Sequence, residues 1–232
     1  KINNKKVKWI SNFSKIGNGP VIFIGNEFFD AIPVKQFVKK KHKFYEKHVK
    51  LIKNKKILNI LKISNKYEIK KILSYKSFNN SNFIEFPKKG LEELEKVVAK
   101  IKKNKGGVLL IDYGYLGKMN KSTLQSVKSH RKNSLNKNLG NADITSLVNF
   151  TLLKEFFLKR NMKIKNIVSQ GFFLKKMGIL LRANNLSKTM SFKDKAKLYT
   201  KILRLVDEKF MGELFKVIFA YNNDKTNFSG FE

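Results

Sequence analysis

The chain has 232 residues, of which 42% are hydrophobic, so it is large enough for one ordinary domain and is not wholly disordered. It contains no cysteine, which excludes a disulfide framework, a catalytic thiolate and a cysteine-ligated metal site. No apolar run approaches the length of a transmembrane helix, and no signal-peptide pattern opens the sequence. Because it begins with lysine and not with methionine, we expect it to be part of a longer product.

The formal net charge of +33 suggests a partner that carries phosphates, because clustered basic side chains neutralise them. Two features argue against a specific nucleic-acid partner. The basic residues are spread along the whole chain, and nearly all are lysine, whereas arginine is the usual reader of base edges and phosphates. We therefore favour a coding bias of the kind found in AT-rich genomes, with a basic polyanion-binding protein as the alternative.

The first candidate site follows an apolar run near the beginning of the chain. Val21–Ile24 predicts a fully buried strand, which stops at Gly25 and is followed by Asn26, Glu27 and Asp30. Ligands of open α/β sheets bind at the carboxyl ends of the strands, so these polar side chains mark a candidate site. The alternative is an Asx turn that caps a short helix, with both carboxylates merely solvated.

The next region alternates apolar residues with lysines over residues 34–63, which predicts an antiparallel insertion of two or three strands with one face toward water. Asn54-Lys55 is typical of a hairpin turn within it. His42 and His48 lack further ligands at suitable spacing, so we expect surface histidines and predict no metal site. Residues 64–81 are weakly patterned and are interpreted as a connector.

A helical period appears after Pro87, where apolar residues recur three or four apart from Leu91 to Ile101. Gly106-Gly107 ends this predicted helix, and Val108–Ile111 predicts a second buried strand. Strand, crossover and strand form a unit whose two strands are parallel. We therefore expect Val21–Ile24 and Val108–Ile111 to be neighbouring parallel strands in the middle of a mixed sheet.

Asp112 and Tyr113 directly follow the second strand, so both strands are expected to deliver polar side chains to the same edge of the sheet. The alternatives are that Asp112 caps a turn and that Tyr113 only packs. Residues 116–145 form a long polar connection, which we expect to cover the substrate. His130 lies within it, and a structural or substrate-lining role is favoured over a catalytic one.

The rest of the chain alternates short predicted elements. They are a strand over 147–150, a helix over 152–158, a strand over 164–168, a helix or turn over 170–179, an amphipathic helix over 196–210 and a terminal strand over 214–221. This order of strands and helices is typical of an α/β fold.

Several short blocks occur in one order over nearly the whole chain. They are GNEFFDAIPVKQF (25–37), GG (106–107), LIDYG (110–114), TLQ (123–125) with His130, Gly140 with DIT (143–145), VNF (148–150), Gln170 with FL (173–174), MGI (177–179), MG (211–212), FKV (215–217) and GF (230–231). Together they resemble the MidA-type family of S-adenosylmethionine-dependent methyltransferases. Asn149 departs from the family, which usually has aspartate there, and this places any role for a carboxylate at that position in doubt.

The resemblance implies an α/β fold with a Rossmann-like class I methyltransferase sheet, of which residues 1–232 would form the C-terminal portion, with the antiparallel β insertion at 34–63. It implies S-adenosylmethionine as cofactor, no metal, and methylation of an arginine guanidinium nitrogen in a partner protein. By family, that partner is a respiratory complex I subunit. The implied location is the cytoplasm of a bacterium or the mitochondrial matrix of a eukaryote.

The resemblance also implies roles for individual residues. The carboxylates of Glu27 and Asp30 (catalytic) would form a bidentate clamp on the guanidinium. The amide of Asn26 and the ring of Trp9 would contact the cofactor. Three further side chains would line the substrate: Asp112, Tyr113 and His130. For Trp9, packing in the core is the alternative.

Class I methyltransferases hold the cofactor with a glycine-rich turn after the first strand and an acidic residue after the second. No GxGxxG or GxGxG pattern occurs in this chain. The resemblance places Lys1 just after the third strand, so we expect this chain alone to bind S-adenosylmethionine poorly. An inactive remnant or a scaffold subunit is therefore a further alternative, and the oligomeric state is not predicted.

Overall fold

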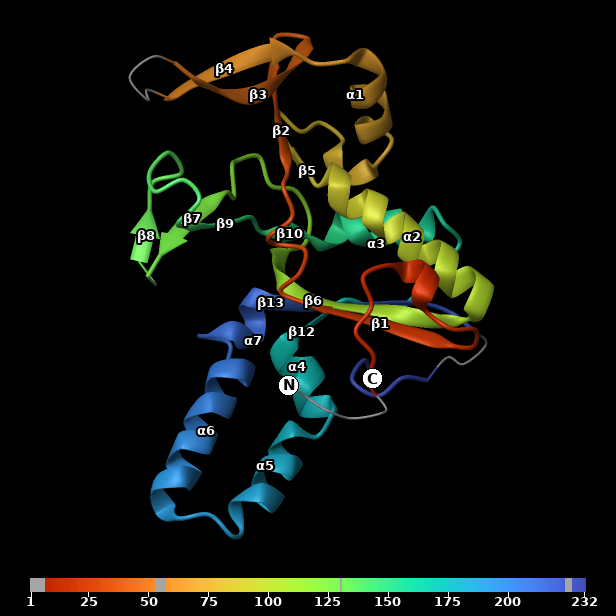
Figure 1. Cartoon of the computed structure of the whole chain (residues 1–232), viewed down its shortest axis with the longest axis vertical. Coiled ribbons are helices and arrows are strands. Elements are labelled where there is room, and N and C mark those ends of the chain that lie inside the picture. Colours follow the sequence, from red (N-terminus) through yellow and green to blue (C-terminus); the bar gives the residue numbers. More distant parts are fainter. Residues whose placement is uncertain (1–6, 53–56, 130, 224–226) are drawn as a thin grey trace.

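The computed structural model describes residues 7–52, 57–129, 131–223 and 227–232. Its centre is a mixed sheet whose main strands, in order, are β1 (Val21–Asn26), β6 (Gly106–Tyr115), β13 (Phe215–Asn222) and β11 (Lys163–Ile164) (Figure 1). The short strands β10 (Val148–Asn149) and β12 (Val168–Ser169) pair with β6 and β13. Since β13 runs antiparallel to β6, the sheet is mixed, as predicted.

β1 and β6 are neighbouring parallel strands, and this prediction is confirmed. Val21 lies opposite Gly106 and Asn26 lies opposite Ile111. The crossover between the two strands ends in α2 (Lys88–Asn104), which packs on both. Gly106 has φ 115°, and a Cβ there would lie 1.9 Å from the carbonyl oxygen of Val21, so glycine is required where β6 starts beside β1.

β1 lies at the edge of the described sheet, so the prediction of a central, fully buried strand is wrong for this strand. Ile22 is 64% exposed and Ile24 is 70% exposed, whereas Val21 and Phe23 pack against the core. Successive side chains of a strand point to opposite faces, and in this structure the described core lies on one face of β1. The burial of an apolar run thus depends on neighbours that its own sequence does not specify.

The core lies between the central sheet and the helices α2 and α3 (Phe150–Leu158). α2 buries the stripe predicted from its sequence, and α3 adds a second set of large apolar side chains. These residues are Leu91, Leu94, Val97, Val98 and Ile101 from α2, and Phe150, Leu152, Leu153, Phe156 and Phe157 from α3. Their burial fixes both helices against the strands that carry the polar residues of the sheet edge.

A second, antiparallel sheet has the order β4-β3-β2-β5. It comprises β2 (Lys35–Lys40), β3 (Lys43–Leu51), β4 (Ile57–Ile63) and the unpredicted β5 (Phe83–Phe86). The expected hairpin turn at Asn54-Lys55 lies outside the described residues. The connector predicted over 64–81 is wrong, because it contains α1 (Lys66–Leu73) and the 3-10 helix η3 (Lys76–Phe78). The Asn65 side chain caps α1 by accepting hydrogen bonds from two backbone N–H groups.

Residues 116–145 contain a small antiparallel sheet of three strands in the order β8-β7-β9. These strands are β7 (Gln125–Lys128), β8 (Arg131–Asn133) and β9 (Asp143–Thr145). The amide of Ser146, directly after β9, donates to the carbonyl of Asp30 at 3.0 Å, so this segment is attached to the turn that follows β1.

Residues 170–214 form a helical arm between β12 and β13. Its helices are α4 (Gln170–Lys176), α5 (Ile179–Ser187), α6 (Phe192–Val206) and α7 (Met211–Leu214). In Figure 1 the arm and the second sheet extend from opposite sides of the central sheet. α6 begins before the predicted residue 196, because the Ser191 hydroxyl caps it by accepting from the Asp194 N–H at 3.2 Å.

α6 ends before the predicted residue 210, since Asp207 adopts an extended conformation with φ −78° and ψ 140°. The 3-10 helix η1 (Phe13–Lys15) precedes β1 and packs against α2. Within the described ranges, no helix combines the length and the apolar composition that crossing a bilayer requires.

Candidate functional site

The carboxyl ends of β1 and β6 meet at one rim of the central sheet. Glu27 follows β1 with φ 48°, and its N–H donates to the carbonyl of Ile111 at 3.0 Å. This left-handed residue ends the strand and turns the chain over the end of β6. Asn26 and Glu27 are both exposed there. We refer to residues 26–30, together with Asp112 and Tyr113, as the rim site.

Asp112 organises the turn. It is 1% exposed, and one carboxylate oxygen accepts from the N–H groups of Phe29 at 2.8 Å and Asp30 at 3.2 Å. The other oxygen accepts from the N–H of Tyr113 at 2.9 Å. Three backbone donors from two strand ends therefore share one buried carboxylate, which fixes the turn on β6.

Asp30 lies next to Asp112 and is also buried, at 6% exposure. The Tyr113 hydroxyl donates to its Oδ2 at 2.6 Å. Its other oxygen, Oδ1, is buried and has no hydrogen-bond partner among the described residues. Such an acceptor costs free energy unless a donor reaches it, so it is a candidate for contact with a ligand.

The two carboxylates influence the protonation of the site. Burial, followed by the negative charge of Asp30, raises the pKa of Asp112 to about 6, against the opposing effect of its backbone hydrogen bonds. Burial and the hydrogen bond to Asp30 raise the pKa of Tyr113 well above its ordinary value. Tyr113 therefore keeps its proton and acts as a hydrogen-bond donor to Asp30 near neutral pH.

The remaining predicted residues lie in different surroundings. Asp30, Asp112 and Tyr113 are in direct contact, and Asn26 and Glu27 stand at the same strand end but face solvent. Trp9 is 83% exposed and makes no ring contact with another described residue, so it does not pack in the core. His130 lies outside the described residues.

Sequence reasoning missed Glu85, a carboxylate in β5 that is 8% exposed. It accepts hydrogen bonds from Gln36 at 2.7 Å and from the amide and hydroxyl of Thr123 at 3.1 and 2.5 Å. It therefore ties the 116–145 segment to the second sheet. The available signal was an isolated glutamate within the apolar sequence FIEF, but its partners come from distant parts of the chain.

Asn149, where the sequence departs from the resembled family, caps α3. Its side-chain oxygen accepts from the N–H of Leu152 at 3.0 Å. Burial, followed by the charge of Glu85, raises the pKa of the neighbouring Tyr115 to about 12, and a hydrogen bond with Asn149 opposes this shift. Asparagine and aspartate both serve as helix caps, so the substitution preserves the local structure.

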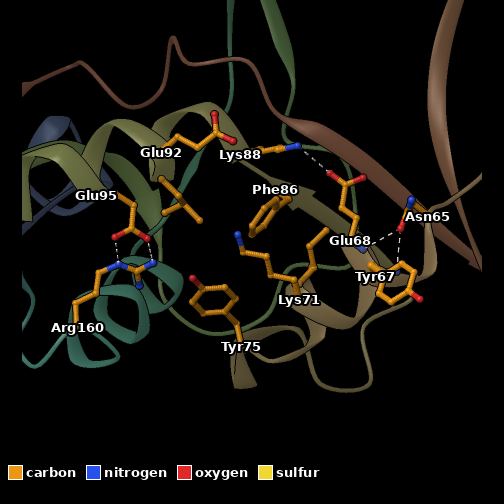
Figure 2. Close-up of a pocket in the computed structure, with 12 residues that line it drawn as sticks. Asn65, Tyr67, Glu68, Lys71, Tyr75, Phe86, Lys88, Glu92, Glu95 and Arg160 are labelled. Atoms are coloured by element: carbon orange, nitrogen blue, oxygen red, sulfur yellow. Dashed lines mark hydrogen bonds and ion pairs between the residues drawn. The ribbon is translucent and has the colours of Figure 1, made fainter.

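A cavity of about 420 Å³ lies between α1, α2 and the end of α3, and we call it the α1–α2 pocket (Figure 2). Its floor includes Tyr75 and Phe86, and ion pairs close its ends: Arg160 with Glu95, and Lys88 with Glu68 at 3.8 Å. None of the residues of the rim site lines this pocket. The acidic and basic side chains that line the α1–α2 pocket balance one another in charge, and none of them holds a buried oxygen or nitrogen without a partner among the described residues in the way that Asp30 does. We therefore place the candidate site at the rim.

Comparison with known proteins gives a family for this chain. Residues 1–168 match a family model described as "Putative S-adenosyl-L-methionine-dependent methyltransferase". The chain is 28% identical over 183 residues to the protein arginine methyltransferase NDUFAF7 homolog of Caenorhabditis elegans, covering 78% of this chain and 42% of the relative. It is 24% identical over 216 residues to protein arginine methyltransferase NDUFAF7 of Danio rerio, covering 93% and 51%. The chain thus spans about half the length of these curated relatives.

Two solved structures from Burkholderia thailandensis share the fold. One, an uncharacterized superfamily protein, has a TM-score of 0.75 at 21% identity and covers 93% of this chain and 57% of its own. The other, described as a "likely methyl transferase" bound to S-adenosyl-homocysteine, has a TM-score of 0.73 at 20% identity and covers 93% and 55%. Because the family model matches well over half of its residues, the chain belongs to this family of S-adenosyl-L-methionine-dependent methyltransferases.

Proposed function

We propose that this chain forms the C-terminal portion of a Rossmann-like class I methyltransferase that methylates an arginine guanidinium nitrogen of a partner protein. The observation that carries the proposal is the buried Asp30 carboxylate, with one oxygen held by Tyr113 and the other free, at the carboxyl end of β1. The parallel pair β1 and β6, followed by the antiparallel β13, supports this architecture. The names of the arginine methyltransferase relatives support the substrate class.

The rim site offers contacts that suit S-adenosylmethionine. Asn26 presents a side-chain amide to solvent, and Ile24 and Phe28 expose apolar surface at the same strand end. A purine nucleoside requires both kinds of contact. We assign cofactor contacts to Asn26 and to Trp9, whose exposed indole is free to stack on an adenine ring. When bound, the cofactor supplies an activated methyl group on a positively charged sulfur.

Glu27 and Asp30 are proposed to hold the substrate guanidinium. Asp30 Oδ1 is a buried acceptor without a partner among the described residues, and Glu27 is exposed to solvent three residues earlier in the same turn. Two carboxylates can bind the planar guanidinium through several charge-assisted hydrogen bonds, orienting one nitrogen and balancing its charge. Tyr113 fixes the Asp30 side chain by its 2.6 Å hydrogen bond. Asp112 contributes by holding the turn that carries Asp30.

The 116–145 segment is proposed to cover the protein substrate, since it is attached to the rim through Ser146. His130 would line the substrate from this segment. Residues 34–63 are proposed as an insertion in the partial methyltransferase domain. On the family resemblance, the substrate is proposed to be a respiratory complex I subunit and the location to be the mitochondrial matrix or the bacterial cytoplasm. The names of the arginine methyltransferase relatives, which call them mitochondrial, support the first location.

The test uses the longest natural product that contains these 232 residues. It is incubated with tritium-methyl-labelled S-adenosylmethionine and a protein extract, and the labelled proteins are hydrolysed to amino acids for chromatography. We expect label in methylated arginine. Label confined to lysine or to nucleic acid, or no label from a product that binds the cofactor, would overturn the proposal, and the last result would favour the scaffold alternative.

A further inference from the structure

A groove of about 1100 Å³ lies between α1 and the hairpin of β2 and β3. α1 contributes Lys66, Ile69 and Lys70 to this groove, whereas Glu68 and Lys71 of the same helix line the α1–α2 pocket. At 100° per residue, these two sets of side chains lie on opposite sides of the helix axis. α1 therefore separates two cavities of different composition, and we call this one the α1–β3 groove.

The floor of the α1–β3 groove is apolar. Phe44 of β3 and Ile69 and Leu73 of α1 line it, and all three also pack against the main core. Each is partly exposed, so one side of each residue is fixed by the core and the other faces the groove. An apolar ligand that enters the groove therefore meets a surface that is already in place.

Both walls of the groove are basic. Lys39 lies opposite Phe44 in the register of β2 and β3, so the two side chains share one face of the second sheet. Lys43 lines the groove from the same hairpin, and Lys66 and Lys70 line it from α1. None of these four lysines forms an ion pair with another described residue, and no acidic side chain lines the groove. An anionic group is therefore attracted from both sides.

Ser64 adds a neutral polar group to the lining. It directly precedes Asn65, the cap of α1, and its N–H donates to the carbonyl of Phe44 at 3.0 Å. Its hydroxyl is buried and has no hydrogen-bond partner among the described residues. Leaving a buried hydroxyl unpaired costs free energy, which a ligand oxygen in the groove can recover.

The apolar floor selects among the anionic ligands that could enter. A nucleotide base or a peptide backbone carries donors and acceptors along its length, and the floor would leave them unpaired. The surface of a bilayer does not reach the floor, because these side chains are packed on the core while the lysines around them are exposed. An acyl chain has no polar groups to satisfy, so it suits this floor.

We infer that the α1–β3 groove binds a long-chain fatty acid. The acyl chain lies along Phe44, Ile69 and Leu73, and the carboxylate pairs with the lysines of the two walls. A head group with a positive charge is disfavoured, since the groove offers it only lysines. None of the rim-site residues lines this groove, so the inference does not depend on methyl transfer.

The test titrates cis-parinaric acid, a long-chain fatty acid with a fluorescent conjugated chain, into residues 1–232 below its critical micelle concentration. We expect a saturable rise in fluorescence from one site. The double variant Lys39→Glu with Lys70→Glu reverses one charge on each wall, and should weaken binding by about tenfold or more. Lys89→Glu with Lys154→Glu changes the net charge equally at exposed positions outside the groove, and should alter the affinity by about twofold or less.

Competition experiments on the unmodified chain test the two halves of the ligand separately. Palmitate should displace the probe, whereas methyl palmitate, which lacks the charge, and octanoate, which lacks most of the chain, should displace it about tenfold less effectively. Equal displacement by methyl palmitate or by lysophosphatidylcholine would overturn the inference, because the lysines would then be irrelevant. Equal displacement by ATP or by an acidic peptide would overturn it as well, because any anion would then suffice.

NMR of isoleucine methyl groups locates the bound palmitate. Ile69 lines the groove, so we expect its methyl signal to shift with palmitate concentration, while Ile24 of β1 stays unchanged. A shift of Ile24 without a shift of Ile69 would place the ligand elsewhere and overturn the inference. Circular dichroism of each variant confirms that its fold is retained, so a lost affinity reports on the groove.

Discussion

Replacing Asp112 with alanine should lower the free energy of unfolding of residues 1–232 by about 3 kcal/mol or more. The substitution removes the acceptor for three backbone N–H groups, those of Phe29, Asp30 and Tyr113. A buried donor that is left without a partner costs about 1–3 kcal/mol. Urea denaturation measures the change, and Glu92→Ala at an exposed position of α2 is the control, with an expected change within about 0.5 kcal/mol.

The pH dependence of stability shows whether the effect of replacing Asp112 comes from its titratable carboxyl group or only from the volume of its side chain. Its folded-state pKa of about 6 is raised from 3.8, so between these values the folded state binds more protons than the unfolded state. Stability from this group is therefore complete below about pH 4 and falls as the pH rises through 6. Over pH 4 to 7, the wild type should lose about 2 kcal/mol relative to Asp112→Asn. An alanine variant that loses less than about 1 kcal/mol contradicts the described hydrogen bonding. A difference that does not change with pH contradicts the burial of the Asp112 carboxyl beside Asp30.

Replacing Asp30 with asparagine should lower kcat/KM for methyl transfer by about tenfold to a hundredfold, because a hydrogen bond to a charged group contributes about 1.5–3 kcal/mol. Asparagine keeps the shape of the side chain and an oxygen that accepts from Tyr113, but it loses the negative charge that faces the guanidinium. Initial rates with the longest natural product and its labelled substrate measure the effect. Asp194→Asn, at the exposed start of α6 and outside the rim site and the 116–145 segment, is the matched control.

A second variant tests whether Asp30 acts through its negative charge or through the position in which Tyr113 holds it. Tyr113→Phe removes the 2.6 Å hydrogen bond to Asp30 and keeps the ring that packs against Phe215. We expect a smaller loss of rate than for Asp30→Asn. If Asp30→Asn retains the full rate while its stability changes, Asp30 serves only to hold the turn, and the proposed clamp is wrong.

The meeting of Asp30, Asp112 and Tyr113 was predictable, because parallel strands deliver their ends to one edge of a sheet. The separate structural roles of these three residues could not be predicted. Sequence patterns do not show that the Asp112 oxygens are taken up by backbone donors, since this depends on how the turn after β1 lies over β6. The same limit applies to Glu85, whose partners Gln36 and Thr123 are brought to it by the second sheet and the 116–145 segment.

The other incorrect predictions from sequence have two causes. Some depend on tertiary contacts, and others depend on single side chains that no periodic pattern reveals. The run Val21–Ile24 has the composition of a buried strand, yet Ile22 and Ile24 are exposed because β1 is the edge of the described sheet. The Asn65 and Ser191 caps decide where α1 and α6 begin, and each depends on a single side chain rather than on a period. The long helix α2 was predictable, since its apolar stripe persists over several turns.

The measurement that most directly tests the placement of the cofactor is a titration of S-adenosyl-homocysteine into residues 1–232 that carry carbon-13-labelled isoleucine methyl groups, followed by NMR. It detects weak as well as tight binding. We predict concentration-dependent shifts of Ile24, two residues before the rim site on β1, and no shift of Ile72, which lines the α1–α2 pocket. Asn26→Ala should reduce the affinity by about tenfold or less, the contribution of one hydrogen bond. Shifts of Ile72 with an unchanged Ile24 would contradict the account.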